Sequence, residues 1–92
     1  MNKEYNMDVL AKLLDQEGLL LRWPKKPEER QEVLKYLLTK FGAGKTYTEM
    51  EINAILKKWH KFNDHPMLRR ELVDHGLLNR TPDGKAYQVV EA

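Results

Sequence analysis

The hydrophobic residues of the chain change their spacing once, after Gly76. Before this glycine they recur three and four residues apart, which is the period of one face of an α-helix. After it, the runs "LLNR" and "KAYQVV" flank "TPDG", a turn in which proline presets a dihedral, aspartate bonds to the local backbone and glycine supplies a positive φ. The chain is therefore expected to be α+β, with helices followed by a β-hairpin at about residues 77–90.

Two helices are expected in the first half of the chain. One covers residues 5–16, ends at Gly18 and precedes the extended run "GLLLRWP"; its apolar stripe consists of Val9, Leu10, Leu13 and Leu14. The other begins at Pro27, which suits a first helical turn, and Gly42 is expected to end it in the left-handed conformation. Its buried face is expected to contain Val33, Leu34, Leu37, Leu38 and Phe41.

The stretch "FGAGKT", residues 41–46, ends like a phosphate-binding P-loop. A P-loop needs a glycine five residues before its Gly-Lys pair, where this chain has Thr39, and it should follow a strand rather than a helix. The stretch is therefore expected to be a turn. A third helix begins after it, because Thr48 and Glu51 have the spacing of a capping box, and its apolar face contains Ile52, Ile55, Leu56 and Trp59.

The fourth helix is expected to cover about residues 65–75 and to end at Gly76. Asn63 or Asp64 can cap it, and its buried residues are Leu68 and Leu72. Three histidines surround this segment, but their spacing matches no standard set of metal ligands, so they are interpreted as caps and packing groups: His60, His65 and His75.

Composition excludes several classes of activity. The 92 residues contain no cysteine and no serine, which removes disulfides, thiolate metal sites and the two commonest side-chain nucleophiles. Because the carboxylates are scattered singly, we expect no enzyme and no cofactor. No run is apolar enough for a signal peptide or a membrane span, so a cytoplasmic protein is expected. The net charge of +2 is too small to imply nucleic acid by itself.

The order of the expected elements is typical of a winged helix-turn-helix, a three-helix core with a C-terminal hairpin wing. Residues 1–17 would form an extra N-terminal helix, and residues 18–92 the winged-helix-like domain. Leu77 and Leu78 would anchor the first strand of the wing. The side chains expected to project from the hairpin are Arg80, Lys85 and Tyr87.

Three phrases, "RWPKKPEERQEVLKYLLTKF", "YTEMEINAIL" and "HPMLRRELVDHGLLNRTPDGKAY", resemble a bacterial family catalogued as domain of unknown function number two thousand and eighty-seven. The resemblance covers about residues 18–88. Its most specific part is residues 68–74, "LRRELVD", followed by Gly76, Leu77, Leu78, Arg80, Asp83 and Gly84. Members of that family occur alone or joined to a DNA-binding helix-turn-helix and are often labelled transcriptional regulators. The resemblance therefore implies a regulatory setting without a defined biochemical activity.

Duplex DNA is one expected partner. In a winged helix the fourth helix can enter the major groove while the wing rests on neighbouring phosphates. The expected contacts are Arg69 and Arg70 on this helix and Arg80 and Lys85 on the wing, with three auxiliary lysines: Lys57, Lys58 and Lys61. Arg69 and Arg70 have a second interpretation, in which they hold carboxylates such as Glu49, Glu71 or Asp74 and fix one helix against another. The fourth helix also carries acids, so tight base readout by this helix alone is not expected.

The alternative is a protein-interaction or dimerisation module of a regulatory complex, which binds another regulator or a second copy of the chain without contacting DNA. The apolar stripe of residues 5–16 could cover the domain's own core, or it could pair two copies of the chain with two-fold symmetry. Pairing would bring two wings to one duplex and strengthen weak binding through avidity.

Overall fold

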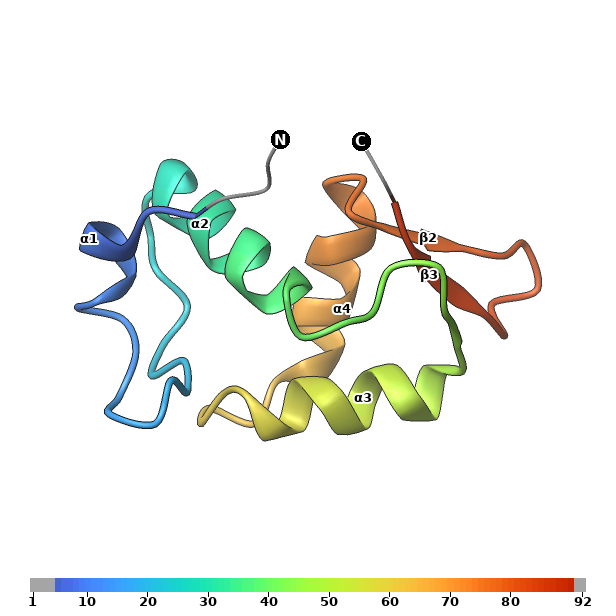
Figure 1. Cartoon of the computed structure of the whole chain (residues 1–92), viewed down its shortest axis with the longest axis horizontal. Helices are drawn as coiled ribbons and strands as arrows, with labels where there is room; N and C mark the ends of the chain where they lie inside the picture. The colour runs from blue at the N-terminus through green and yellow to red at the C-terminus, as the bar shows by residue number, and fades with distance from the viewer. Residues whose placement is uncertain (1–4, 91–92) are drawn as a thin grey trace.

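The computed structural model describes residues 5–90, which contain four helices and a three-stranded antiparallel sheet with the strand order β1-β3-β2 (Figure 1). The expected α+β class is confirmed. The elements in chain order are α1 (Met7–Leu10), α2 (Pro27–Leu38), β1 (Thr46–Tyr47), α3 (Glu49–Lys58), α4 (His65–Asp74), β2 (Leu78–Arg80) and β3 (Tyr87–Val89).

The β-hairpin expected after Gly76 is present. Strands β2 and β3 pair antiparallel, with Leu78 opposite Val89 and Arg80 opposite Tyr87. The sheet has a third strand that the sequence analysis missed: β1 pairs with β3 and places Tyr47 opposite Tyr87. A two-residue strand is too short to show an alternating pattern, so no signal in the sequence identifies β1.

The beginnings of α3 and α4 follow local rules. Thr48 caps α3, where the Glu51 amide donates to Thr48 Oγ1 at 3.1 Å and the Thr48 amide donates to Glu51 Oε1 at 2.9 Å. The expected capping box is thus confirmed. Asp64 caps α4 by accepting from the Met67 amide, and Gly76 has a φ of 75° just beyond the helix end.

The helix expected at residues 5–16 is wrong in length, since α1 ends at Leu10. After one turn the chain folds back on itself, and Leu14 forms an antiparallel bridge with Leu20. The Asp15 carboxylate stabilises the reversal by accepting from the amides of residues 17 and 19, each at 2.9 Å. Gly18, with a φ of 84°, belongs to this turn and does not end a helix.

The left-handed stop expected at Gly42 is also wrong. The positive φ after α2 belongs to Gly44, at 79°, and the Gly42 amide instead donates to the Tyr47 hydroxyl at 2.7 Å. The "FGAGKT" stretch thus follows a helix and leads into strand β1, which is the reverse of the P-loop context.

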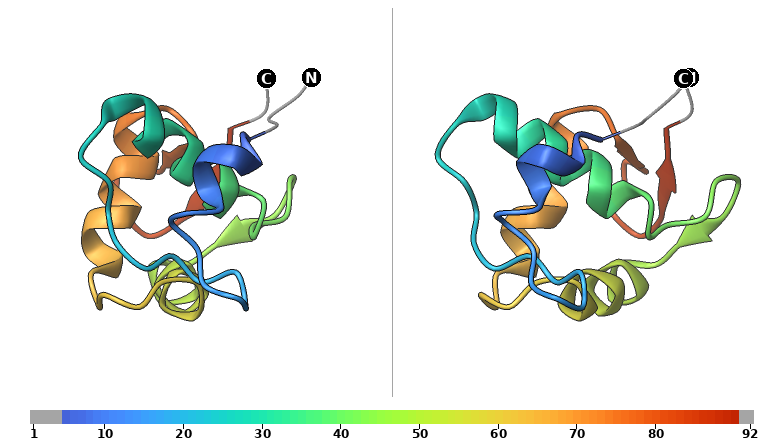
Figure 2. Two further views of the ribbon diagram at one scale, coloured as in Figure 1. Left: turned by 90° about the vertical axis from the view of Figure 1, so that its left-hand side faces the viewer. Right: turned by 60° about the vertical axis from the view of Figure 1, so that its left-hand side comes forward.

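One hydrophobic core joins the N-terminal segment to the helices and the hairpin. Leu10 and Leu13 are wholly buried in it, so the apolar stripe covers the domain's own core, one of the two expected arrangements. Leu20 ties the segment to the end of α3, because its amide donates to the Trp59 carbonyl at 2.8 Å and its carbonyl accepts from the Lys61 amide at 2.9 Å. This junction lies at the lower edge of both views in Figure 2.

The expected division of the chain into residues 1–17 and 18–92 stays a prediction. Residues 1–4 and 91–92 of these two parts lie outside the described range. Within residues 5–90, no helix has the length and apolar character that crossing a bilayer requires.

Candidate nucleic-acid interface

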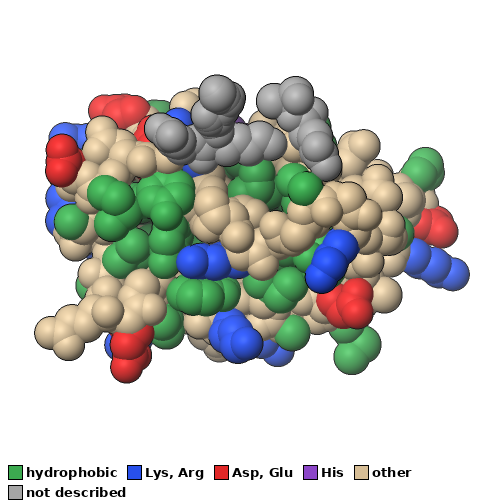
Figure 3. All heavy atoms as spheres, in the orientation of Figure 1, with side chains coloured by type: hydrophobic (Ala, Val, Ile, Leu, Met, Phe, Trp, Pro, Cys, Tyr) green, Lys and Arg blue, Asp and Glu red, His purple; other side chains and the backbone are tan. Residues whose placement is uncertain are grey.

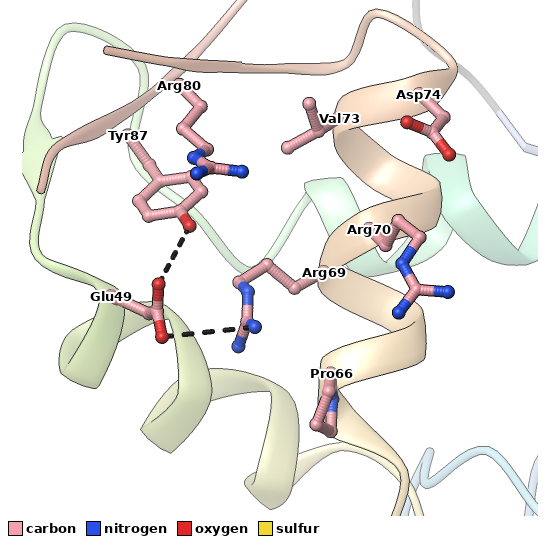
Figure 4. Close-up of a pocket in the computed structure, with 8 residues that line it drawn as sticks. All are labelled: Glu49, Pro66, Arg69, Arg70, Val73, Asp74, Arg80 and Tyr87. Atoms are coloured by element: carbon pink, nitrogen blue, oxygen red, sulfur yellow. Dashed lines mark hydrogen bonds and ion pairs between the residues drawn. The ribbon is translucent and has the colours of Figure 1, made fainter. Parts of the chain in front are cut away.

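The start of α3, one face of α4 and the hairpin surround an open pocket of about 320 Å³ (Figure 4). Three of the seven expected contact residues line it, although they come from two separate elements. The lining consists of Glu49 from α3, Pro66, Arg69, Arg70, Val73 and Asp74 from α4, and Arg80 and Tyr87 from the hairpin.

Arg69 is held by α3. Its Nη1 donates to Asn53 Oδ1 at 2.5 Å, and its Nη2 lies 3.9 Å from Glu49 Oε2. The Arg69 side chain is 21% exposed and that of Glu49 is 49% exposed, so solvent weakens their attraction. This is the helix-fixing role that the sequence left open for Arg69. Glu49 and Asn53 share a face because they are four residues apart on α3.

Tyr87 corrects another expectation, because it does not project from the hairpin. Its side chain is 2% exposed, and its hydroxyl donates to Glu49 Oε1 at 3.1 Å. Burial, together with this hydrogen bond, raises the pKa of the Tyr87 hydroxyl above its ordinary value. Glu49 therefore binds the hairpin through Tyr87 and α4 through Arg69 at the same time.

Arg80 reaches the pocket because of the strand register. It lies directly opposite Tyr87 in the β2–β3 ladder, which places both side chains on the same face of the sheet. Its guanidinium also passes over Gly84, where a Cβ would come within 3.0 Å of Arg80 Nη2. Figure 4 shows Arg80 beside the Tyr87 ring, on the side of the pocket opposite Arg69. Arg80 makes no ion pair with any residue in the described range.

Lys85 lies in the turn of the hairpin and is exposed. The turn is ordered by Asp83, whose carboxylate accepts from the Thr81 hydroxyl at 2.6 Å and from the Lys85 amide at 3.0 Å. These hydrogen bonds, with that of Thr81 the strongest, lower the pKa of Asp83. The Lys85 side chain therefore extends from a hairpin turn with a defined backbone.

Arg70 is exposed, and Figure 4 shows its side chain in front of α4 and directed away from Arg69. The expected ion pair between Arg70 and Asp74 is not present among the residues that the structure describes. Both residues line the pocket, and because no ion pair joins Arg70 to a described residue, its guanidinium is available to a partner.

The three expected auxiliary lysines lie at or just beyond the C-terminal end of α3, whereas the pocket includes Glu49 at its N-terminal end. Lys57 and Lys58 are exposed in the last turn. Lys61 differs from them because its Nζ lies 3.0 Å from Asp15 Oδ2. The Leu19 amide and Lys61 together lower the pKa of Asp15, so this lysine already has an anionic partner within the chain.

Two of the three histidines, His60 and His75, contact the backbone as the sequence analysis expected, whereas His65 Nδ1 is buried without a hydrogen-bond partner among the described residues. The buried His60 ring bridges the turn between α3 and α4, with Nδ1 2.6 Å from the Leu56 carbonyl and Nε2 accepting from the Asp64 amide at 2.9 Å. His75 Nδ1 lies 3.0 Å from the Glu71 carbonyl. Within residues 5–90 no group of three or more ligating side chains is arranged to hold a metal ion.

The charged side chains do not form a patch of one sign on the face shown in Figure 3, where basic and acidic groups are scattered among hydrophobic ones. In the pocket itself, three arginines are accompanied by two carboxylates, those of Glu49 and Asp74. Binding of a polyanion to this pocket would therefore depend on individual guanidinium groups and not on a uniformly positive surface.

A family model described as "Uncharacterized protein conserved in bacteria (DUF2087)" matches residues 19–89. The matched range includes α2, the sheet, α3, α4 and every residue of the pocket. The chain belongs to this family. The resemblance noted in the sequence is thereby confirmed, and the DUF2087 range begins after α1, within the segment that carries Leu20. No curated protein and no solved structure matches the chain significantly.

Proposed function

We propose that the chain is a winged helix-turn-helix domain that binds duplex DNA weakly and acts in transcriptional regulation. The order of elements supports this proposal: α2, β1, α3, α4, β2 and β3 follow one another, and β1 lies beside β3 in the sheet. In such a domain α3 and α4 form the helix-turn-helix and the β2–β3 hairpin is the wing.

The observation that carries the proposal is the convergence of α4 and the hairpin on one surface. α4 supplies Arg70 to this surface and the hairpin supplies Arg80, and Lys85 is exposed in the turn of the same hairpin. These three cations have no anionic partner among the described residues. A helix in the major groove with a hairpin on the adjacent backbone needs cations on both elements.

The expected binding is weak and strongly dependent on salt. If three guanidinium or ammonium groups each neutralise one phosphate, log K should fall with log salt with a slope of about −3. Carboxylates near the same surface oppose the phosphates, which argues for non-specific or modestly specific affinity. Lys57 and Lys58 would add a smaller contribution from the far end of α3.

The competing function is a protein-interaction module in a regulatory complex. One observation favours it: Met50, in the first turn of α3 beside Glu49, is 81% exposed. Methionine is enriched in protein interfaces relative to the rest of the surface. The two functions differ in their response to salt and to DNA.

Fluorescence anisotropy of a labelled random duplex, titrated with the chain at two salt concentrations, tests the proposal. Association should weaken steeply at the higher salt. The Arg70→Ala/Arg80→Ala double variant should lower the association constant about tenfold at low salt and make the salt slope less negative by about two.

The matched control is Arg22→Ala, which removes an exposed arginine from the segment before α2. It should change the association constant less than about twofold, and Lys57→Ala/Lys58→Ala should fall between the two. Binding that is absent, or that does not respond to salt, would reject DNA as the partner. Light scattering at the same concentrations would then report a dimer.

A further inference from the structure

We infer that the pocket between α4 and the hairpin binds phosphate, and that without a ligand the Glu49 carboxylate occupies the position of the phosphate. The inference deepens the proposed function and rests on it for the source of the phosphate. Two guanidinium groups, those of Arg69 and Arg80, both line this pocket and carry the inference. Arg69 lies at one side and Arg80 at the other, as Figure 4 shows.

The position of Glu49 supports this inference. Its two carboxylate oxygens lie between α4 and the hairpin, one 3.9 Å from Arg69 Nη2 and the other accepting from the Tyr87 hydroxyl at 3.1 Å. A phosphate oxygen at this place would find the same donors, a guanidinium and a hydroxyl, and in addition Arg80. A phosphate with several acceptor oxygens can engage two guanidinium groups that a single carboxylate does not join.

The Arg69–Glu49 contact is weak enough to be exchanged. At 3.9 Å it is longer than a charge-assisted hydrogen bond, and the Glu49 side chain is half exposed, so a ligand can reach it. Arg69 remains oriented by Asn53 through its other terminal nitrogen. Arg69 Nη2 can therefore exchange Glu49 for a phosphate oxygen while Nη1 keeps its hydrogen bond to Asn53 of α3.

The charge of Glu49 should thus oppose a bound phosphate directly. Glu49→Gln keeps an oxygen that can accept from Tyr87 and removes only the negative charge. Loss of one unit charge about 4 Å from the ligand should tighten binding about fivefold at low salt. The matched control is Glu28→Gln, which makes the same charge change in the first turn of α2, outside the pocket. It should change binding less than about 1.5-fold.

Two probes distinguish the source of the phosphate. The first is the labelled duplex, titrated by anisotropy against the wild-type chain, Glu49→Gln and Glu28→Gln. The second is inorganic phosphate, titrated while the side-chain Nε–Hε signals of Arg69 and Arg80 are followed by NMR, with Arg22 as the reference signal. The same spectra report whether each variant is folded.

Four outcomes decide between the two proposals. Tighter duplex binding by Glu49→Gln alone, with shifts at Arg69 and Arg80, supports a backbone phosphate in the pocket. Shifts with inorganic phosphate but no duplex binding support the pocket with a small phosphate compound as its ligand and reject the proposed function. Salt-dependent duplex binding that Glu49→Gln leaves unchanged, with no shifts, keeps the proposed function and overturns the pocket. Absence of both kinds of binding overturns both.

Discussion

The two ends of α3 both carry charged side chains, but the chain uses them differently. At the N-terminal end, Glu49 contacts Arg69 from α4 and Tyr87 from the hairpin, and an open pocket remains between these elements. At the C-terminal end, Lys61 is paired with Asp15 and the buried His60 closes the turn to α4. The cations at the C-terminal end are close together because they are neighbours in the sequence. The pocket at the N-terminal end exists because tertiary packing brings three elements together.

The difference has a physical reason. The C-terminal end is covered by the segment that carries Leu20, whose backbone bonds to both Trp59 and Lys61. Trp59 itself is only half buried, and Lys40 Nζ lies 3.9 Å from its ring centroid. Burial lowers the pKa of Lys40. This end is therefore organised mainly for stability, although Lys57 and Lys58 are exposed there, while the N-terminal end borders the open pocket.

The largest expected effect is a loss of folding stability on substitution of His60, at the C-terminal end of α3. His60→Ala removes a buried ring that bonds to the Leu56 carbonyl and the Asp64 amide, so the free energy of unfolding should fall by about 3 kcal/mol. Urea denaturation followed by circular dichroism measures this loss. The control His75→Ala, at an exposed position, should lose less than about 1 kcal/mol. Equal losses in the two variants would contradict the structural role of His60.

A smaller effect is expected at the N-terminal end. Tyr87→Phe keeps the buried ring and removes only the hydroxyl that donates to Glu49. Because Glu49 is half exposed and water can replace the donor, the free energy of unfolding should fall by about 1 kcal/mol. The same urea experiment measures it. Tyr5→Phe is the control, since the Tyr5 ring lies edge-on to Tyr36 without a described hydroxyl partner. A loss as large as that of His60→Ala would show that both ends are equally structural.

The smallest expected effect is a pH dependence at the C-terminal end. Burial, followed by the charges of Lys57 and Arg69, lowers the pKa of His65 below the ordinary 6.5. In that range the unfolded chain binds the proton more readily than the folded chain, so stability should fall as pH decreases below 6.5 towards the lower folded pKa. Urea unfolding at about pH 7.5 and about pH 5.5 should show a smaller loss for His65→Gln than for the wild type. An identical loss would remove His65 as a source of the effect.

Sequence reasoning succeeded at most features that depend on neighbouring residues, although the local stop expected at Gly42 was wrong. The capping box at Thr48, the Asp64 cap, the stop at Gly76 and the hairpin turn with its positive φ at Gly84 are all local, and each is present. It failed at residues 11–16, where the helical pattern of Leu13 and Leu14 was overridden by the Asp15 turn and the bridge to Leu20. Tertiary burial of an apolar stripe does not require the stripe to be helical.

For the site, the sequence identified the cations but not their surroundings. Arg69, Arg70 and Arg80 were expected as contacts, whereas the place of Glu49 between Arg69 and Tyr87 depends on three elements separated by up to 38 residues. A period-2 count along β3 does not by itself say which face of the hairpin is buried. The orientation of Tyr87 therefore followed only from the register with β1 and β2.

By itself, the sequence determined which segments become helices α2, α3 and α4 and where α3 and α4 begin. It also determined that a hairpin follows Gly76. These features depend on capping groups, apolar periods and turn residues, which act within a few positions. Only the tertiary structure decided that Tyr87 is buried, that Lys61 is paired and that Arg69 and Arg80 face one pocket. These outcomes depend on hydrogen bonds and burial between residues far apart in the chain, which no local pattern records.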